Sequence, residues 1–360
     1  MESTTVERMR VAVGQAISPT DELLAFARQL GVTSIQFNTP SIPGEVRWEV
    51  KDLLALRRRC ESYGLTLEAI ENMPDAFYQR TMLGLPGRDE EIENIIATIR
   101  NMGEAGIPIL GYHFMPASVW RTGLAPQGRG KALVSVFDLE KAQNPANRSG
   151  ILVARRDMRP GDAKDSWMKG AHQDLKVNLD DNAMWDNYTY FVKAVVPEAE
   201  RASVKLALHP DDPPVPQLAN VARLFRSVDA LKRASNIVDS PAWGLDLCLG
   251  TVSEMGGESA VLEAIRYFGS RNKIFYVHLR DVIGTVPRFE ECFLGEGNYR
   301  PRRVLQALGA VGFTGFILDD HVPAIVNDSP YNHRGRAYTI GYIQGLLESL
   351  DADADGQVAE

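Results

Sequence analysis

The chain has 360 residues, of which 44% are hydrophobic and 24% charged, so it can bury a large core, and general disorder is excluded. Its formal net charge is -8 and no basic stripe offsets the acidic excess, which excludes a nucleic-acid or acidic-membrane partner. The three cysteines are too few and too far apart for a disulfide framework, and the sequence has neither a signal-peptide pattern nor about 18 consecutive apolar residues, so we expect a cytoplasmic protein without a membrane span.

Strands and helices alternate along the first third of the chain. Ser18 to Asp21 is a helix-start signal after the first strand, and isoleucines recur at helical spacing between Asp89 and Ala105. A further helix is predicted over Trp48 to Tyr63. The predicted strands are Met9 to Gln15, Ser34 to Asn38, Leu65 to Asn72 and Ile107 to Phe114. A strand and a helix every 30 to 40 residues is typical of parallel βα units.

The alternation stops between residues 115 and 181, where Gly, Arg, Lys and Asp dominate and no period holds. We interpret this stretch as a long insertion that leaves the barrel after strand four, either as a lid over a site or as a contact with another subunit. A helix over Asn182 to Ala202 restores the pattern.

In the second half, four short apolar runs each stop on a polar group. The runs end at His209, Cys248, His278 and Asp320. Helices are predicted at Val221 to Val228, Ser259 to Phe268, Arg302 to Ala310 and Arg334 to Leu350. Eight strands and eight helices predict an α/β fold, a (β/α)8 TIM barrel that occupies residues 1–350 as one domain, with a disordered acidic tail at 351–360.

The four polar strand ends predict a metal site. Parallel strands bring His209, Cys248, His278 and Asp320 to the C-terminal rim, where the active sites of such barrels lie. Two imidazoles, a thiolate and a carboxylate suit a divalent cation; the softness of the set favours Zn²⁺ and leaves Mn²⁺ or Fe²⁺ open.

Each residue also has a structural interpretation. A buried histidine can be a hydrogen-bonded core residue, Cys248 a small hydrophobic side chain, and Asp320 a loop cap; it is their coincidence that favours a site. Cys60 lies on the apolar face of a predicted helix, and both it and Cys292 are expected in the core.

Neighbouring polar residues supply further candidates. Arg280 could clamp a carboxylate or pair with Asp281 on the surface, and His321 could be an acid or base or form a loop hydrogen bond. Asp211 and Asp212 could support the metal ligands or stabilise the proline-rich turn.

Several motifs together resemble the mannonate dehydratases, a family of xylose-isomerase-like TIM barrels. They are the run His209-Pro210-Asp211-Asp212-Pro213-Pro214, the strand of Cys248 with Gly250-Thr251, Val277-His278-Leu279-Arg280, Phe289-Glu290 and Asp320-His321. The segments Trp48 to Glu71, Tyr112 to Trp120 and Arg336 to Leu346 are also similar, so the resemblance covers nearly the whole chain.

The resemblance implies a Mn²⁺-dependent lyase that converts D-mannonate to 2-dehydro-3-deoxy-D-gluconate in hexuronate breakdown. It implies the same four metal ligands, and it implies active-site roles for Arg280, His321 and Tyr331. His321 would remove the C2 proton, and Tyr331 or a water on the metal would protonate the leaving hydroxyl. His113 and the segment 117–122 differ from the family's usual residues and are expected to contact the substrate.

Two other functions stay open at this point. An isomerase or epimerase would use the same proton abstraction without loss of water, and a non-catalytic protein would only bind the sugar acid. The expected partner is a small-molecule sugar acid, and a homo-oligomer is expected because barrels of this type often associate.

Overall fold

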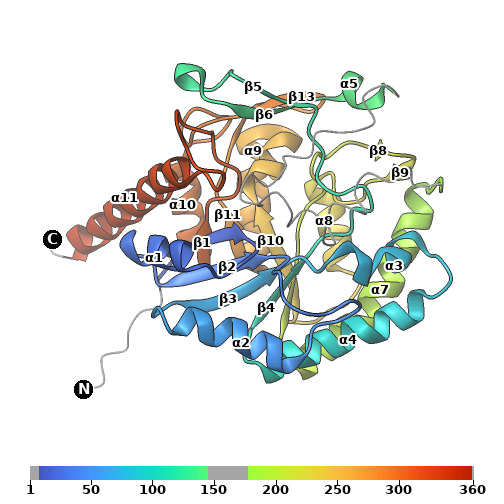
Figure 1. Ribbon diagram of the computed structural model, residues 1–360. Coiled ribbons are helices and arrows are strands. Elements are labelled where there is room, and N and C mark those ends of the chain that lie inside the picture. Colours follow the sequence, from blue (N-terminus) through green and yellow to red (C-terminus); the bar gives the residue numbers. More distant parts are fainter. Residues whose placement is uncertain (1–7, 145–176, 359–360) are drawn as a thin grey trace.

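Eight parallel strands close into a barrel in the order β1-β14-β11-β10-β7-β4-β3-β2, within a computed structural model that describes residues 8–144 and 177–358 (Figure 1). The strands are β1 (Arg10–Ala16), β2 (Ser34–Asn38), β3 (Thr66–Glu71), β4 (Ile109–Tyr112), β7 (Lys205–Leu208), β10 (Trp243–Cys248), β11 (Ile274–His278) and β14 (Phe316–Leu318). This closure confirms the predicted (β/α)8 barrel.

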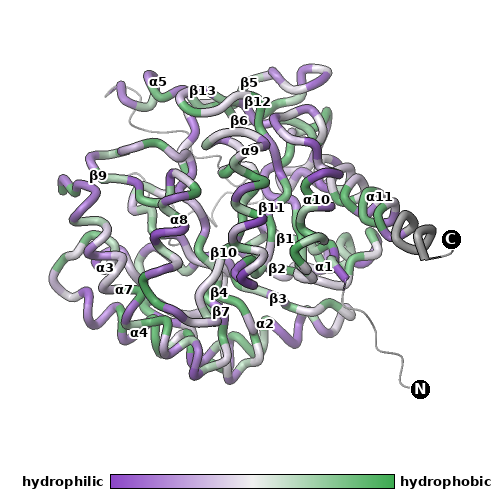
Figure 2. Tube along the Cα trace, turned by 180° about the vertical axis from the view of Figure 1, so that it is seen from behind, coloured by the Kyte–Doolittle hydropathy of each residue, from purple (hydrophilic) through white to green (hydrophobic). Residues whose placement is uncertain are grey.

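Helices cover the outside of the barrel (Figure 1). They are α1 (Asp21–Gln29), α2 (Val50–Glu61), α4 (Arg88–Glu104), α7 (Asp181–Arg201), α8 (Val228–Ser235), α9 (Leu249–Gly269), α10 (Pro301–Ala310) and α11 (His333–Val358). Local chemistry fixes their starts: the Thr20 side chain accepts from the Leu23 N–H at the start of α1, as the helix-start signal predicts. Purple and green alternate along α4 in Figure 2, because its isoleucines face the barrel and its charged residues face solvent.

Two apolar layers hold the barrel together. The inner layer fills the barrel with small and aromatic side chains, including Ala12, Ala69, Ala207, Tyr276 and Phe316. The larger layer lies between the strands and the helices, and it contains Cys60, as predicted. A packed interior leaves the C-terminal rim as the place for chemistry.

A second, antiparallel sheet crosses the rim, and we call it the rim sheet. Its order is β12-β13-β6-β5, and it lies at the top of Figure 1. Its strands are β5 (Gly123–Ala125), β6 (Val134–Asp138), β12 (Val282–Thr285) and β13 (Arg288–Glu291). The loop after β4 therefore pairs with the loop after β11. A two-stranded sheet, β8 (Gln217–Leu218) with β9 (Val221–Ala222), and the short helices η1 (Asp75–Phe77), η2 (Arg129–Lys131), α3 (Gln79–Leu83) and α5 (Leu139–Gln143) complete the described elements.

Some boundaries differ from the predictions. The predicted helix at 221–228 is wrong: Val221 belongs to β9, and α8 begins at Val228 because Ser227 caps it. Helix α9 begins directly after Cys248, ten residues before the predicted start, and breaks at Gly256 and Gly257. The described part of the predicted insertion, 115–144, contains β5, β6 and α5, while 145–176 lies outside the described residues.

Helix α11 continues to Val358, beyond the point where the sequence predicts a tail. Among the described residues, the helices include none with the length and apolar character needed to cross a membrane.

Candidate metal centre and active-site pocket

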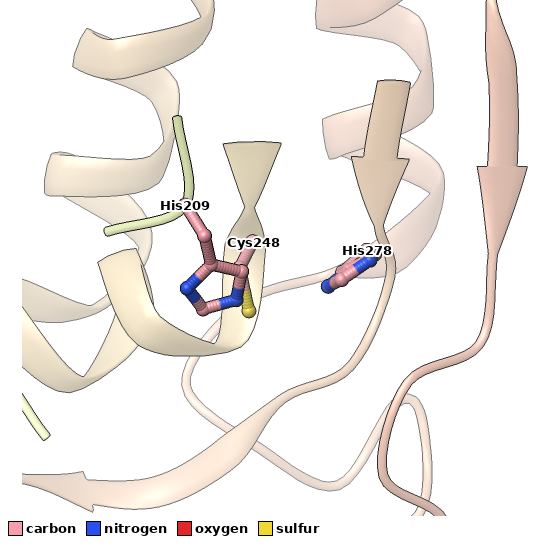
Figure 3. A group of neighbouring side chains, drawn as sticks. All are labelled: His209, Cys248 and His278. Carbon is pink, nitrogen blue, oxygen red and sulfur yellow. The ribbon is translucent and has the colours of Figure 1, made fainter. Parts of the chain in front are cut away.

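Three of the predicted ligands converge at the rim (Figure 3). One donor atom each from His209, Cys248 and His278 lies within 4.8 Å of the other two, and all three residues are buried. Asp320 is close to this group, because its Oδ2 lies 3.8 Å from Cys248 Sγ and 3.8 Å from His278 Nδ1. The four side chains come from consecutive barrel strands, β7, β10, β11 and β14.

The two histidines present free nitrogen atoms to this point. His209 Nδ1 lies 2.6 Å from the Pro210 carbonyl oxygen, to which it donates, so Nε2 is left as the ligand atom. His278 Nδ1 is buried without a hydrogen-bond partner among the described residues. A buried unpaired imidazole nitrogen beside a thiol and a carboxylate fits a bound divalent cation.

A carboxylate pair below the site orients His278. Its Nε2 lies 3.2 Å from Glu71 Oε2 and 3.5 Å from Asp246 Oδ1. A proton on Nε2, shared with these carboxylates, leaves the Nδ1 lone pair for the metal, as in other carboxylate–histidine–metal arrangements. Burial raises the pKa of Asp246 well above its usual value, and the 3.5 Å contact with His278 is longer than a direct hydrogen bond, so neither carboxyl oxygen has a hydrogen-bond partner among the described residues. Glu71 accepts instead from the amide of Gln15 at 2.8 Å.

The surroundings favour the thiolate of Cys248. Burial raises its pKa, but Arg280 and His209 outweigh burial and bring the pKa down to about 5. The Thr251 hydroxyl donates to Sγ at 3.2 Å, and α9 begins at the next residue, so its positive end faces the sulfur. A thiolate at neutral pH is the form that binds metal.

Arg280 does not clamp a ligand in the pocket, and it does not pair with Asp281 on the surface. Its guanidinium is buried and donates to Asp320 at 2.7 Å, to Glu254 at 3.0 Å and to Asp212 at 2.6 Å. Gly250 makes room for it, since a Cβ there would lie 2.4 Å from the guanidinium. Arg280 therefore acts by holding Asp320 and by lowering the pKa of that carboxyl, together with His321 and His278, against the effect of burial.

A second buried arginine extends this network into the rim sheet. Arg121 pairs with Asp212, and it donates to Glu291 at 3.1 Å and to Glu254 at 3.4 Å. Asp212 thus joins both arginines and has a larger role than the turn, whereas Asp211 stabilises the turn by accepting from the Phe225 N–H at 2.7 Å. Each charged group of the network is buried beside a group of opposite charge, as buried charges require, and Glu254 Oε2 is left without a hydrogen-bond partner among the described residues.

The pocket above these ligands has a volume of about 140 Å³. His209, Asp320, His321 and Tyr331 line it, and Leu124 of the rim sheet forms part of its wall. Burial lowers the pKa of His321, but Asp320 and Glu291 outweigh burial and raise it. His321 is thus placed at the pocket with its Nδ1 held by Glu291 at 2.6 Å.

Tyr331 also lines the pocket, and its hydroxyl donates a hydrogen bond to the Gly14 carbonyl oxygen at 2.6 Å. It can donate a proton to a ligand only if this hydrogen bond is exchanged for one to the ligand.

The other half of the rim, formed by β1 to β4, carries mainly neutral polar groups. Gln15, Asn38, Asn72 and His113 line the pocket from this side, together with the carboxyl of Asp75. His113 and Ser118 of the segment 117–122 were both expected to contact a substrate, and both line the pocket. In that segment Arg121 instead lies in the buried ionic network.

Sequence reasoning missed the roles of Glu71, Asp246 and Glu291, and it expected Arg121 among the substrate contacts and not in a buried ionic network. Asp246 carries a usable signal, because it lies two residues before Cys248 in one strand and so faces the same side. Glu71 is the last residue of β3 and follows the same strand-end rule as the ligands. Glu291 and Arg121 carry no such signal, because their places depend on the pairing of the rim sheet.

Comparison with known proteins places these residues in context. The model of the D-mannonate dehydratase (UxuA) family matches residues 17–357. Mannonate dehydratase 2 of Halalkalibacterium halodurans is 32% identical over 319 residues, which are 85% of this chain and 88% of that protein. The crystal structure of mannonate dehydratase from Streptococcus suis serotype 2 is 27% identical, with a TM-score of 0.80 and 96% of each chain covered. A structure of L-ribulose 3-epimerase, 16% identical over 96% of this chain and 97% of that chain, has a TM-score of 0.57 and shares the fold.

Proposed function

The chain belongs to the D-mannonate dehydratase family, and we propose that it removes water from D-mannonate to give 2-dehydro-3-deoxy-D-gluconate. The observation that carries the proposal is the convergence of His209, Cys248 and His278 beside Asp320, in a pocket that also holds His321. The family match spans all of these residues.

We propose that His209, Cys248, His278 and Asp320 hold Mn²⁺. The softness of the donor set alone would favour Zn²⁺, and the resemblance to the mannonate dehydratases, which implies Mn²⁺, supports Mn²⁺. Bound there, the cation would draw electron density from the carboxylate end of the acid and make the C2 proton more acidic. The thiolate of Cys248 needs reducing surroundings, which supports a cytoplasmic location, and the three cysteines are free. The homo-oligomer stays a prediction.

His321 is the proposed base. It takes the proton from C2, and the carboxylate of Glu291 stabilises the imidazolium that forms. Tyr331 is the proposed acid. Its hydroxyl exchanges the hydrogen bond to the Gly14 carbonyl oxygen for one to the substrate, and it gives its proton to the C3 hydroxyl as the C3–O bond breaks. Water and an enol result. The enol becomes the 2-keto-3-deoxy acid when a proton is added at C3 and the O2 proton is released, and transfer of the His321 proton to the Tyr331 oxygen through solvent restores both side chains.

The test is incubation of the protein with Mn²⁺ and D-mannonate. We expect a 2-keto-3-deoxy acid, detected by the thiobarbiturate reaction and by a product mass lower by one water. A product of unchanged mass would assign an isomerase or epimerase instead. Metal binding without turnover on any aldonate would assign a sugar-acid binding protein.

A further inference from the structure

Asp75 and His113 face each other across a gap at the edge of the pocket. His113 Nε2 lies 3.6 Å from Asp75 Oδ1, beyond the length of a direct hydrogen bond. Both side chains are at least nine-tenths buried, with 8% and 7% of their surface exposed, and both line the pocket. Among residues 8–144 and 177–358, no hydrogen bond to the Asp75 carboxyl is found. The Asp75 carboxyl and His113 Nε2 thus lie beside each other at the pocket without a hydrogen-bond partner among the described residues.

The hydrogen-bonding roles at this gap are defined. The Met115 N–H donates to His113 Nδ1 at 3.2 Å, so the proton of the neutral ring is on Nε2, toward Asp75. Burial lowers the pKa of His113 to about 3 and keeps the ring neutral. Burial also raises the pKa of Asp75 to about 7, so that its carboxyl can accept and, when protonated, donate.

We propose that Asp75 and His113 form a subsite that binds one hydroxyl of the sugar chain and selects for acids that carry it. Because the two atoms are 3.6 Å apart, an oxygen can lie about 2.8 Å from both of them only to one side of the line that joins them, and we place it on the side of the pocket. It would accept from His113 Nε2 and donate to Asp75. This inference rests on the proposed dehydratase function and identifies which part of the substrate the pocket selects.

The position in the barrel supports a hydroxyl away from the carboxylate end. His113 follows β4, and β4 lies opposite β14 in the barrel order, four strands away from Asp320 and His321. His113 also lies next to the proposed ligands, because the His209 N–H donates to the carbonyl oxygen of the preceding residue, Tyr112, at 2.8 Å. A sugar acid held by its carboxylate end among the ligands from β7 to β14 therefore extends its chain toward β3 and β4.

The two groups also suit a hydroxyl better than a charged group. A neutral imidazole N–H and a carboxyl near its pKa offer one donor and one acceptor, which a hydroxyl can use together. A carboxylate or phosphate would meet the Asp75 oxygens without a cationic side chain between them. The neutral amides of Asn38 and Asn72 on the same side of the pocket agree with a polyhydroxylated chain.

The test compares D-mannonate with three acids that keep its first three carbons and lack the hydroxyl at C4, C5 or C6 in turn. With the Mn²⁺-loaded protein, we expect kcat/KM to fall by about 10- to 100-fold for one of the three acids. The selectivity ratio is kcat/KM for D-mannonate divided by kcat/KM for that acid. In Asp75→Ala and in His113→Ala, we expect this ratio to fall to within about threefold of unity. Asp75→Asn keeps an acceptor and a donor at this point and should restore most of the ratio.

The control is Asp229→Ala, which removes an exposed carboxyl on α8 outside the pocket and should keep the wild-type ratio. Thermal unfolding of each variant shows whether it is folded. If the ratio stays at the wild-type value in both Asp75→Ala and His113→Ala, the subsite is refuted.

A second readout separates this inference from the proposed function. In a His321→Asn background, calorimetry measures binding of the same four acids without turnover, and the same loss of discrimination is expected when Asp75 or His113 is truncated. If protein with an intact His321 does not turn over D-mannonate but the His321→Asn variant binds the acids selectively, the dehydratase function is contradicted and the subsite is supported. If the protein turns over D-mannonate and the Asp75 and His113 variants keep the wild-type selectivity, the dehydratase function is supported and the subsite is contradicted.

Discussion

His321 Nδ1 lies 2.6 Å from Glu291 Oε1, and this contact joins the end of a barrel strand to the rim sheet. Burial raises the pKa of Glu291, but His321 and Arg121 outweigh burial and lower it to about 2, so the carboxylate stays charged. An imidazole held on a buried carboxylate has one tautomer and a stabilised cationic form, which is what a base requires.

Glu291→Gln should therefore lower kcat by about 10- to 100-fold, with KM changed less than about threefold, because the neutral amide stabilises the imidazolium less. Steady-state kinetics with D-mannonate measures both constants. The neighbouring Glu290→Gln, on the same strand, serves as the control and should keep the wild-type kcat. A rise in KM at constant kcat would assign Glu291 to substrate binding instead.

Cys248→Ala should reduce the affinity for Mn²⁺ by at least about 100-fold and abolish turnover, because one of four ligands is lost. The metal content after dialysis, measured by mass spectrometry, checks this. Cys292→Ala provides the control, since that cysteine is buried outside the site. Full metal stoichiometry in Cys248→Ala would refute the ligand assignment.

Asp246→Asn should weaken metal binding by about 10- to 100-fold while the four ligands remain, because the amide no longer fixes the proton on His278 Nε2. Titration of the metal-free protein with Mn²⁺ measures the change. Unaltered affinity would show that Glu71, at 3.2 Å, orients the ring without Asp246.

Arg121→Met should lower the free energy of unfolding by about 3–5 kcal/mol, because Asp212 and Glu291 would lose a buried partner. Chemical denaturation gives the value. Arg288→Met is the matched control: Arg288 also forms ion pairs in the rim sheet, but its side chain is 65% exposed, and a change of about 0–1 kcal/mol is expected. Equal losses in the two variants would contradict the argument from burial.

Asp75 should make stability depend on pH. Its pKa is raised by burial from 3.8 to about 7, so between these values the folded protein holds a proton that the unfolded chain has lost. Stability therefore falls as the pH rises from about 4 to about 7 and stays lowered above that range. The difference of about 3 units corresponds to roughly 4 kcal/mol as an upper limit.

Asp75→Asn removes this ionisation and should be more stable than the wild type at pH 8 by roughly 2–4 kcal/mol, with little difference at pH 4. Thermal unfolding across this pH range tests the sign. A difference that is independent of pH would show that Asp75 does not titrate in the folded state.

The barrel and the rim positions of the proposed ligands are predictable because buried parallel strands are short apolar runs, and the residue at which each run stops lies on the rim. Cys248 and His278 are the last residues of their strands. The rim sheet is not predictable in this way, because strands such as Val282–Thr285 are short and half-exposed, and their partners are distant in sequence. Arg280 shows the same limit: its position beside His278 is visible in the sequence, but the carboxylates that bind it arrive from four other elements.

The division of the rim into two halves has an evolutionary consequence. The four proposed metal ligands come from β7, β10, β11 and β14, all in the second half of the chain, while His113 and Asp75 of the proposed subsite come from the first half. In this proposal, the metal ligands and the residues that select the substrate are therefore encoded in separate stretches of the gene. Recombination that exchanges the segment before α7 between relatives can therefore change the accepted acid and keep the metal centre only if the exchanged segment retains Glu71, which contacts His278, and Arg121, which pairs with Asp212 and Glu291.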